Sequence, residues 1–158
     1  MSFIFGFLAA LVIIAVIGAI FMNRMGRFFF LRNKSRLNFN DTLQTIRENI
    51  EANQRGWFSE SEKDFNLAYQ KKKKGELPFQ LTVFKIGNSD HSFRVNSALP
   101  AVSTFMPAAI AVVGRKNGSV DIYRKNTGMM GYFFTGTVKE VMSKEVTVGM
   151  NEILEGAI

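Results

Sequence analysis

Residues able to carry out acid–base or metal chemistry are few in this chain. His91 is the single histidine, and the 158 residues include no cysteine. One histidine rules out a multi-histidine metal site within one chain, and the missing thiols exclude disulfides, thiolate zinc sites and cysteine nucleophiles. Asp90 precedes His91, but adjacent side chains face each other only if a turn after Gly87-Asn88 brings them together. We therefore expect a surface pair, with no catalytic residue and no enzyme activity.

Methionines supply the other candidate ligands. Met106, Met129 and Met130 carry thioethers, which with His91 are suited to a soft ion such as Cu(I). Methionines that fill an irregular core are far commoner. We predict neither a metal nor a cofactor.

Asn126 begins a loop that is a candidate wall of a small ligand cleft. Its amide offers both a donor and an acceptor, and three aromatic residues follow the loop, Tyr132, Phe133 and Phe134. The alternative, which we favour for these rings, is packing in the core. The candidate ligand-binding residues are His91, Met106, Asn126 and Met129.

The first 23 residues differ in composition from the rest. Between positions 3 and 22 only Gly6 and Gly18 fall outside the hydrophobic set, and no side chain is charged. A helix of this length spans about 30 Å, the thickness of the hydrocarbon core of a bilayer. A signal peptide has a basic start and a shorter apolar stretch, and a core helix normally shows a polar face. We favour a retained single-pass transmembrane helix over residues 1–23 above these two alternatives.

A basic juxtamembrane segment, residues 24–37, follows without an acidic residue and carries the predicted membrane-interface residues Arg24, Arg27, Arg32, Lys34 and Arg36. Positive charge at one end of a span keeps that end in the cytoplasm. We expect the N-terminus outside and the domain inside, at the inner (plasma) membrane. For residues 28–31, the alternative to an interfacial segment is a first strand or a continued helix packed on the domain.

The net charge of +7 falls mostly in that segment, since 15 basic and 13 acidic side chains remain after residue 36. A nucleic-acid-binding domain needs more excess positive charge on one face, so we expect no nucleic-acid partner. Residues 71–74 form a run of four lysines. We interpret the run as a solvated loop or helix end, with attraction to anionic lipid headgroups as the alternative.

Hydrophobic spacing predicts an α+β domain over residues 38–158, in which helices pack on a small antiparallel sheet. A first helix, capped by Asn40 or Asp41, runs to about Gln54 and buries Leu43, Ile46 and Ile50. Residues 59–64 form a polar region, residues 65–72 a short helix and residues 79–86 a strand, and an irregular stretch follows.

The second half of the domain opens with a hairpin. Residues 108–114 and 119–124 flank Asn117-Gly118, a dipeptide that favours tight turns. Residues 137–140 have the spacing of a capping box, which predicts a helix that begins at Thr137. A last amphipathic helix over residues 150–158 turns Ile153 and Leu154 inward.

Several of these segments resemble the DUF302 family, a family of domains of unknown function. The similar stretches are residues 105–112, 117–120 and 126–130, together with residues 39–56 and 83–88. The resemblance implies a small α+β domain, found mostly in bacteria and archaea, that associates as a dimer. It also implies that many relatives carry cysteines where this chain has Gly87 and Ala108, so any thiol chemistry of such relatives does not extend to it.

Together these features predict a single-pass membrane protein whose cytoplasmic domain is a non-enzymatic binding or interaction module. Its expected partners are the lipid bilayer and either a second copy of the chain or a larger membrane complex. The alternative is an accessory protein that handles a small ligand or a metal in redox or sulfur metabolism.

Overall fold

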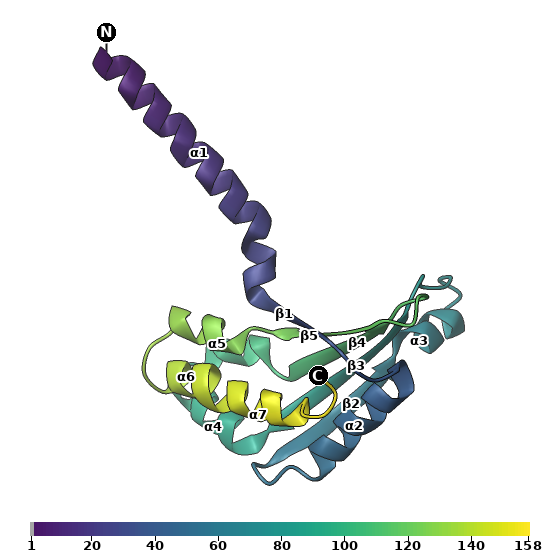
Figure 1. Cartoon of the computed structure of the whole chain (residues 1–158). Coiled ribbons are helices and arrows are strands. Elements are labelled where there is room, and N and C mark those ends of the chain that lie inside the picture. The colour runs from purple at the N-terminus through teal and green to yellow at the C-terminus, as the bar shows by residue number, and fades with distance from the viewer. Residues whose placement is uncertain (1) are drawn as a thin grey trace.

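The computed structural model describes residues 2–158 of the chain. Helix α1 (Ser2–Phe29) extends away from the domain and carries the N-terminus at its far end (Figure 1). The side chains of residues 2–5, 8–10, 22–25 and 27 lie outside the described set, and with them those of Arg24 and Arg27. Within the part of the chain that the structure describes, no helix qualifies as long and apolar enough to cross a membrane.

The domain is built on a five-stranded antiparallel sheet with the order β1-β5-β4-β3-β2. The strands are β1 (Phe30–Lys34), β2 (Trp57–Asp64), β3 (Gln80–Asn88), β4 (Ala108–Gly114) and β5 (Val120–Lys125). Gly118 has a φ of 82° in the turn between β4 and β5, which explains the Asn-Gly pair there. The predicted α+β class with an antiparallel sheet and packed helices is confirmed.

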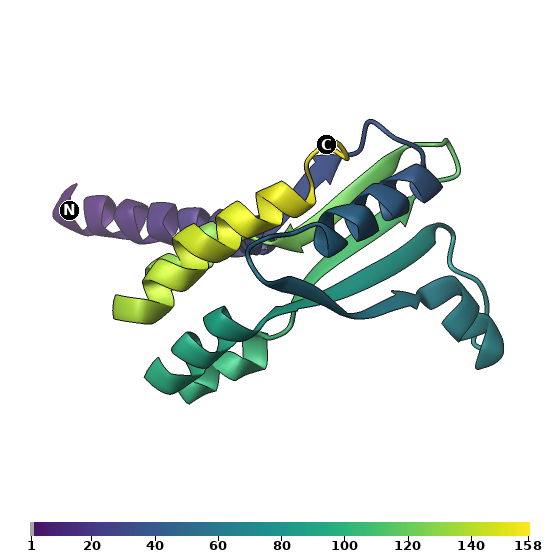
Figure 2. The ribbon, with the colours of Figure 1, turned by 90° about the horizontal axis from the view of Figure 1, so that it is seen from below.

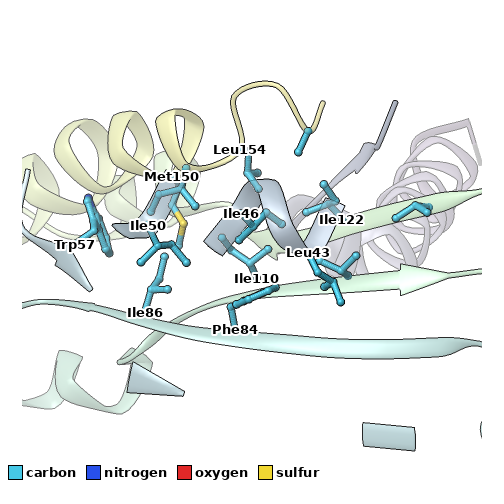
Figure 3. Close-up of a cluster of buried hydrophobic side chains, with 14 residues drawn as sticks. Leu43, Ile46, Ile50, Trp57, Phe84, Ile86, Ile110, Ile122, Met150 and Leu154 are labelled. Atoms are coloured by element: carbon cyan, nitrogen blue, oxygen red, sulfur yellow. The ribbon is translucent and has the colours of Figure 1, made fainter. Parts of the chain in front are cut away.

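Helices α2 (Phe39–Glu51) and α7 (Thr147–Ile153) lie on one face of the sheet (Figure 2). Between them and the sheet lies a cluster of aliphatic and aromatic side chains, which we call the first cluster (Figure 3). The predicted stripe of α2 is buried in it, as are Ile153 and Leu154. Its members are Leu43, Ile46, Ile50, Trp57, Phe84, Ile86, Ile110, Val112, Val120, Ile122, Met150, Ile153, Leu154 and Ala157.

The remaining helices lie beyond the ends of the sheet. Helix α3 (Phe65–Lys71) contacts β3 and β2. The others are α4 (Ser89–Ala98), η1 (Pro100–Phe105), α5 (Thr127–Met130), η2 (Gly131–Phe133), α6 (Gly136–Glu140) and η3 (Val141–Val146), a π-helical segment. These helices enclose a second cluster, made of Val95, Val102, Met130, Val138, Val141 and Met142.

Two edge strands were missed by the hydrophobic pattern. Strand β1 lies inside the predicted juxtamembrane segment, so the alternatives of a continued helix and a first strand both hold, α1 ending at Phe29 and β1 beginning at Phe30. Strand β2 covers the predicted polar region, and every residue after Trp57 is exposed. Because both lie at edges of the sheet, backbone pairing defines them more than burial does.

Two helical regions also differ from the prediction. Residues 89–105, expected to be irregular, form α4 and η1, in which only Val95 and Val102 are buried. Too few buried positions recur to give a helical period. The predicted capping box is wrong, because the cap of α6 is Thr135 and Thr137 lies inside the helix. The cap of α2 is Asn38, whose side chain accepts from the Asp41 amide.

Candidate functional site

A cleft opens where β3 passes into α4 and η1 returns into β4. It has a volume of about 110 Å³ and lies between the first and second clusters. The walls are mainly apolar, with Trp57 and Ile86 on the side of the sheet and Val95 and Val102 on the side of the helices. Four methionines also line it, Met106, Met130, Met142 and Met150.

His91 is a polar side chain in the wall of this cleft that contacts both an aromatic ring and a carboxylate. It lies in the first turn of α4, which is capped by Asn88, whose Oδ1 accepts from the His91 amide at 3.0 Å. The imidazole meets the Trp57 ring edge to face, with centroids 5.5 Å apart, and its Nε2 lies 3.2 Å from the Glu145 carboxylate. Its Nδ1 is buried and has no hydrogen-bond partner among the described residues.

The surroundings of His91 favour its neutral form. Burial lowers the pKa of His91 below its usual 6.5, although the carboxylates of Glu145 and Asp90 oppose the shift. A neutral imidazole carries one proton, and the carboxylate facing Nε2 holds it there. We infer that Nδ1 offers an unused acceptor lone pair.

Asp90, His91 and Glu145 lie close enough to resemble a metal site, since their ligand atoms are within 4.8 Å of one another. Arg94 occupies the position between the carboxylates, however. Its guanidinium donates to both oxygens of Glu145 at 2.8 Å and to Asp90 at 3.3 Å. These bonds raise the pKa of Arg94 and lower that of Glu145. A cation would have to displace Arg94, so this cluster is an ion-paired support for His91.

Lys125 is a second polar group in the wall of the cleft. Its Nζ donates to the Phe105 carbonyl, and burial lowers the pKa of its ammonium group. The bond joins β5 to the end of η1. It thereby fixes one side of the opening.

Comparison with known proteins identifies the domain on which this cleft is built. The profile described as "Domain of unknown function DUF302" matches residues 31–157, from β1 to the residue before the last. The chain belongs to the DUF302 family. The crystal structure of an uncharacterized conserved DUF302 protein from Bacillus stearothermophilus is similar in fold, with a TM-score of 0.69. The two chains are 18% identical, and the match covers 82% of this chain and 98% of that one.

No curated protein matches the chain. The family and its solved relative therefore establish the fold of the DUF302 domain and leave its activity open. Gly87 and Ala108, where the resemblance places cysteines in relatives, both line the cleft.

The DUF302 domain brings together two of the four predicted ligand-binding residues. His91 and Met106 both line the cleft, whereas Asn126 and Met129 do not, although the neighbouring Met130 does. Asn126 instead caps α5, accepting from the Met129 amide at 3.1 Å and donating to the Phe28 carbonyl at 3.0 Å. Both ends of its amide are used within the chain.

The aromatic residues after this loop do not form a wall of the cleft. Tyr132 and Phe133 are 71% and 68% exposed, so the expectation that they pack in the core is wrong. Phe134 alone packs against the second cluster. The turn η2 directs the other two rings outward.

Of the predicted interface residues with described side chains, Lys34 and Arg36 are exposed. Arg32 is engaged with Asp121, to which its Nε and Nη2 donate at 2.9 and 3.0 Å. Arg115 donates to the same carboxylate at 2.7 Å. Burial would raise the pKa of Asp121, but the hydrogen bonds from both arginines outweigh it and the net shift is downward.

Glu145, Arg94, Lys125 and Trp57 were not singled out from the sequence. Asp90 and Arg94 have the i, i+4 spacing of a helical ion pair. That signal becomes useful once residues 89–98 are assigned to a helix. Glu145 is 51 residues from Arg94, and nothing local in the sequence indicates their pairing.

Proposed function

We propose that this DUF302 domain is a binding module that holds a small, largely apolar molecule with one hydrogen-bond donor in the cleft beside His91. The observation that carries the proposal is that His91, whose Nδ1 is buried and unpartnered among the described residues, lines a mainly apolar cleft. Ligand sites typically combine apolar walls with a few placed polar groups. A donor on the ligand would satisfy Nδ1, which is otherwise buried at a cost of about 1–3 kcal/mol.

The size of the cleft limits the ligand to about one ring. A dry cavity of roughly 150 Å³ lined by apolar side chains accepts benzene. The cleft, at about 110 Å³, is somewhat smaller and is lined by flexible methionines that can adjust to a ligand. Phenol is therefore a suitable probe, because it combines one ring with one donor, and toluene is its match without the donor.

We propose binding without catalysis. The Glu145 carboxylate contacts the Nε2 of His91 and is itself held by Arg94. These contacts fix the orientation of the imidazole and leave Nδ1 for a ligand. A metal-handling role is less well supported, because Arg94 already compensates the carboxylates. A redox or sulfur-linked role gains no specific support from the cleft.

The binding test is a titration of the full chain with phenol and toluene, followed by nuclear magnetic resonance of the methionine methyl groups. We expect saturable shifts for the cleft methionines, with phenol bound more tightly than toluene. His91→Ala should abolish the preference for phenol. Equal affinity of the two probes in the unsubstituted chain would contradict a role for Nδ1.

A matched pair of alanines tests the place of binding. Ala108 lines the cleft, whereas Ala111, on the same strand, faces the opposite side of the sheet and does not line it. Ala108→Leu should block phenol and Ala111→Leu should not. Phenol binding that survives Ala108→Leu would place the site elsewhere.

We also propose that α1 attaches the domain to a membrane as a single span. The apolar run between positions 3 and 22 supports this, as do side chains such as Phe7, Val12, Ile14 and Ile17, which are more than half exposed. Exposed apolar surface costs about 25 cal/mol per Å² in water, and lipid removes that cost. The cytoplasmic side is proposed from the basic residues after α1.

Protease digestion of inside-out vesicles tests this topology, since the exposed domain should be cleaved without permeabilisation. A domain that is cleaved only after the vesicles are opened would show the opposite orientation. A chain that remains soluble after the vesicles are sedimented would refute attachment itself.

Self-association is proposed for the sheet face opposite α2 and α7. Val83, Ala111 and Tyr123 lie on this face, because they alternate with core positions along their strands. All three are half-buried. A second copy or another protein of a membrane complex would cover them. Light scattering of the chain in detergent should give twice the protomer mass, and a monomer that binds no other protein would refute this part.

A further inference from the structure

The turn η2 presents two aromatic rings to the outside of the domain. Tyr132 and Phe133 are among the most exposed large side chains of the described residues. A buried aromatic side chain removes 150–250 Å² from water, so exposing two adjacent ones forgoes a large stabilisation. Adjacent exposed aromatic residues often mark a contact surface.

These rings lie at the base of α1. Phe133 stacks on Phe29, the last residue of α1, with ring centroids 6.0 Å apart and planes inclined by 26°. Asn126 fastens the same point, because its backbone amide donates to the Phe29 carbonyl at 2.8 Å and its side chain donates to the Phe28 carbonyl. Figure 1 shows α5, which leads into η2, beside the lower end of α1.

The backbone of the turn is packed against η3 and closed by a hydrogen bond, with its two rings directed outward. Gly131 is buried against η3, where a β-carbon would come within 2.8 Å of the Ser143 backbone nitrogen. Phe134 closes the turn by donating from its amide to the Gly131 carbonyl. Lys139 places its ammonium group 4.9 Å from the centre of the Tyr132 ring. The result is a fixed pair of aromatic rings with a cation beside them.

We propose that Tyr132 and Phe133 enter the headgroup region of the bilayer that holds α1, as a second contact of the domain with lipid. Aromatic rings are favoured at the boundary between headgroups and acyl chains, and a lysine can extend its ammonium group to lipid phosphates. The contact continues the aromatic end of α1, where Phe28 is also exposed. This inference rests on the proposed membrane attachment.

Tryptophan fluorescence tests the contact in the full chain, reconstituted into phosphatidylcholine and phosphatidylglycerol vesicles with brominated acyl chains. Phe133→Trp reports on η2, and Val12→Trp reports on α1. Phe93→Trp is the matched control, because Phe93 is 73% exposed but lies on α4, away from α1 (Figure 2). The single native tryptophan, Trp57, is 6% exposed and supplies a constant background.

We expect bromine to quench the added tryptophan of Phe133→Trp and Val12→Trp and to leave that of Phe93→Trp unchanged. Quenching of Val12→Trp without Phe133→Trp would overturn the second contact and leave the membrane attachment standing. Quenching of neither would refute the attachment. Equal quenching of Phe93→Trp and Phe133→Trp would show unspecific adsorption of the domain and would also overturn the inference.

A second readout separates lipid from a protein partner on the same surface. Removing both rings, as Tyr132→Ser with Phe133→Ser, should lower the thermal unfolding midpoint only slightly in detergent, because the rings are largely exposed and lose only their contacts with Phe29 and Lys139. In vesicles it should increase hydrogen exchange of the α5 and η2 amides at every protein-to-lipid ratio. A change that appears only at high protein density would indicate a second copy of the chain and would contradict the lipid contact.

Discussion

The two hydrophobic clusters of the domain differ in composition and in filling. The first cluster, between two helices and the sheet, contains isoleucine, leucine, valine, phenylalanine and tryptophan with one methionine and one alanine. Eight of its fourteen residues have no exposure at all: Ile46, Ile86, Ile110, Val112, Ile122, Ile153, Leu154 and Ala157. The second cluster contains only valine and methionine and borders the cleft. Close packing in one place and a cavity in the other arise within the same domain.

We interpret the first cluster as the source of stability and the space beside the second cluster as the binding site. Branched side chains interlock in few conformations and specify one arrangement, whereas methionine, of which four line the cleft, adapts to irregular space. The first cluster fixes the sheet that carries β3 and β4. The second leaves room where those strands end, beside His91. Trp57, Ile86 and Met150 connect the first cluster to the cleft, since they belong to that cluster and also line the cleft.

The largest effect is expected from Ile110→Ala in the first cluster. Ile110 is fully buried on the central strand β4, and its loss removes contacts that nothing can replace. We expect a fall of about 4 kcal/mol in the free energy of unfolding, within the range of roughly 2–5 kcal/mol for such changes. Urea denaturation followed by circular dichroism measures it. An effect below that of Met142→Ala would erase the distinction between the clusters.

Gly149→Ala should disturb both regions through Trp57. A β-carbon at Gly149 would overlap the Trp57 Nε1, so the indole must move. We expect a loss of about 2–3 kcal/mol by overpacking and a weaker affinity for phenol. Gly128→Ala is the control, because its β-carbon would meet nothing closer than 3.4 Å. Similar losses of unfolding free energy in the two variants would show that the overlap with Trp57 is not the cause.

Met142→Ala should cost less than Ile110→Ala. Met142 lines the cleft, so its removal enlarges a space that already exists and that neighbouring methionines can partly fill. We expect about 2 kcal/mol, at the low end for a buried methionine. The same variant should accept a larger ring than phenol, such as naphthol, in a calorimetric titration. Unchanged selectivity for ring size would argue against the cleft as the binding site.

The first cluster was largely predictable from the sequence. The spacing of Leu43, Ile46 and Ile50 and the alternation of Val120 and Ile122 follow from the periods of a helix and a strand. Both patterns report burial on one face. They therefore succeed where an element lies flat on a single core.

The second cluster and the cleft were predicted poorly, because their elements do not bury one continuous face. Helix α4 buries a single residue, Val95, and so shows no clear stripe. The His91 site joins α4 to η3 by ion pairs between residues distant in sequence, and pairing of this kind leaves no periodic trace. Asn126 was predicted to offer its amide to a ligand, but that amide caps α5 and donates to the end of α1.

The smallest expected effect is a pH dependence of the free energy of unfolding that arises from His91 beside the cleft. The pKa of His91 is lowered in the folded domain, while the unfolded chain has the ordinary value near 6.5. Between these two values the unfolded state binds more protons, so stability rises with pH. The contribution is complete above about pH 6.5 and is lost as the pH falls toward the folded value.

Urea denaturation between about pH 5 and pH 8 measures this slope. Asp90, Arg94 and Glu145 face His91, and the lowered pKa of Glu145 acts in the same direction but at more acidic pH. His91→Gln should therefore flatten the curve near pH 6.5 and leave the loss at lower pH, whereas Ile110→Ala should shift the whole curve without changing its shape. A slope near pH 6.5 that persists in His91→Gln would assign the titration to another group. In the chain with His91, protonation should also weaken phenol binding, because the proton takes the Nδ1 lone pair that the phenol hydroxyl needs.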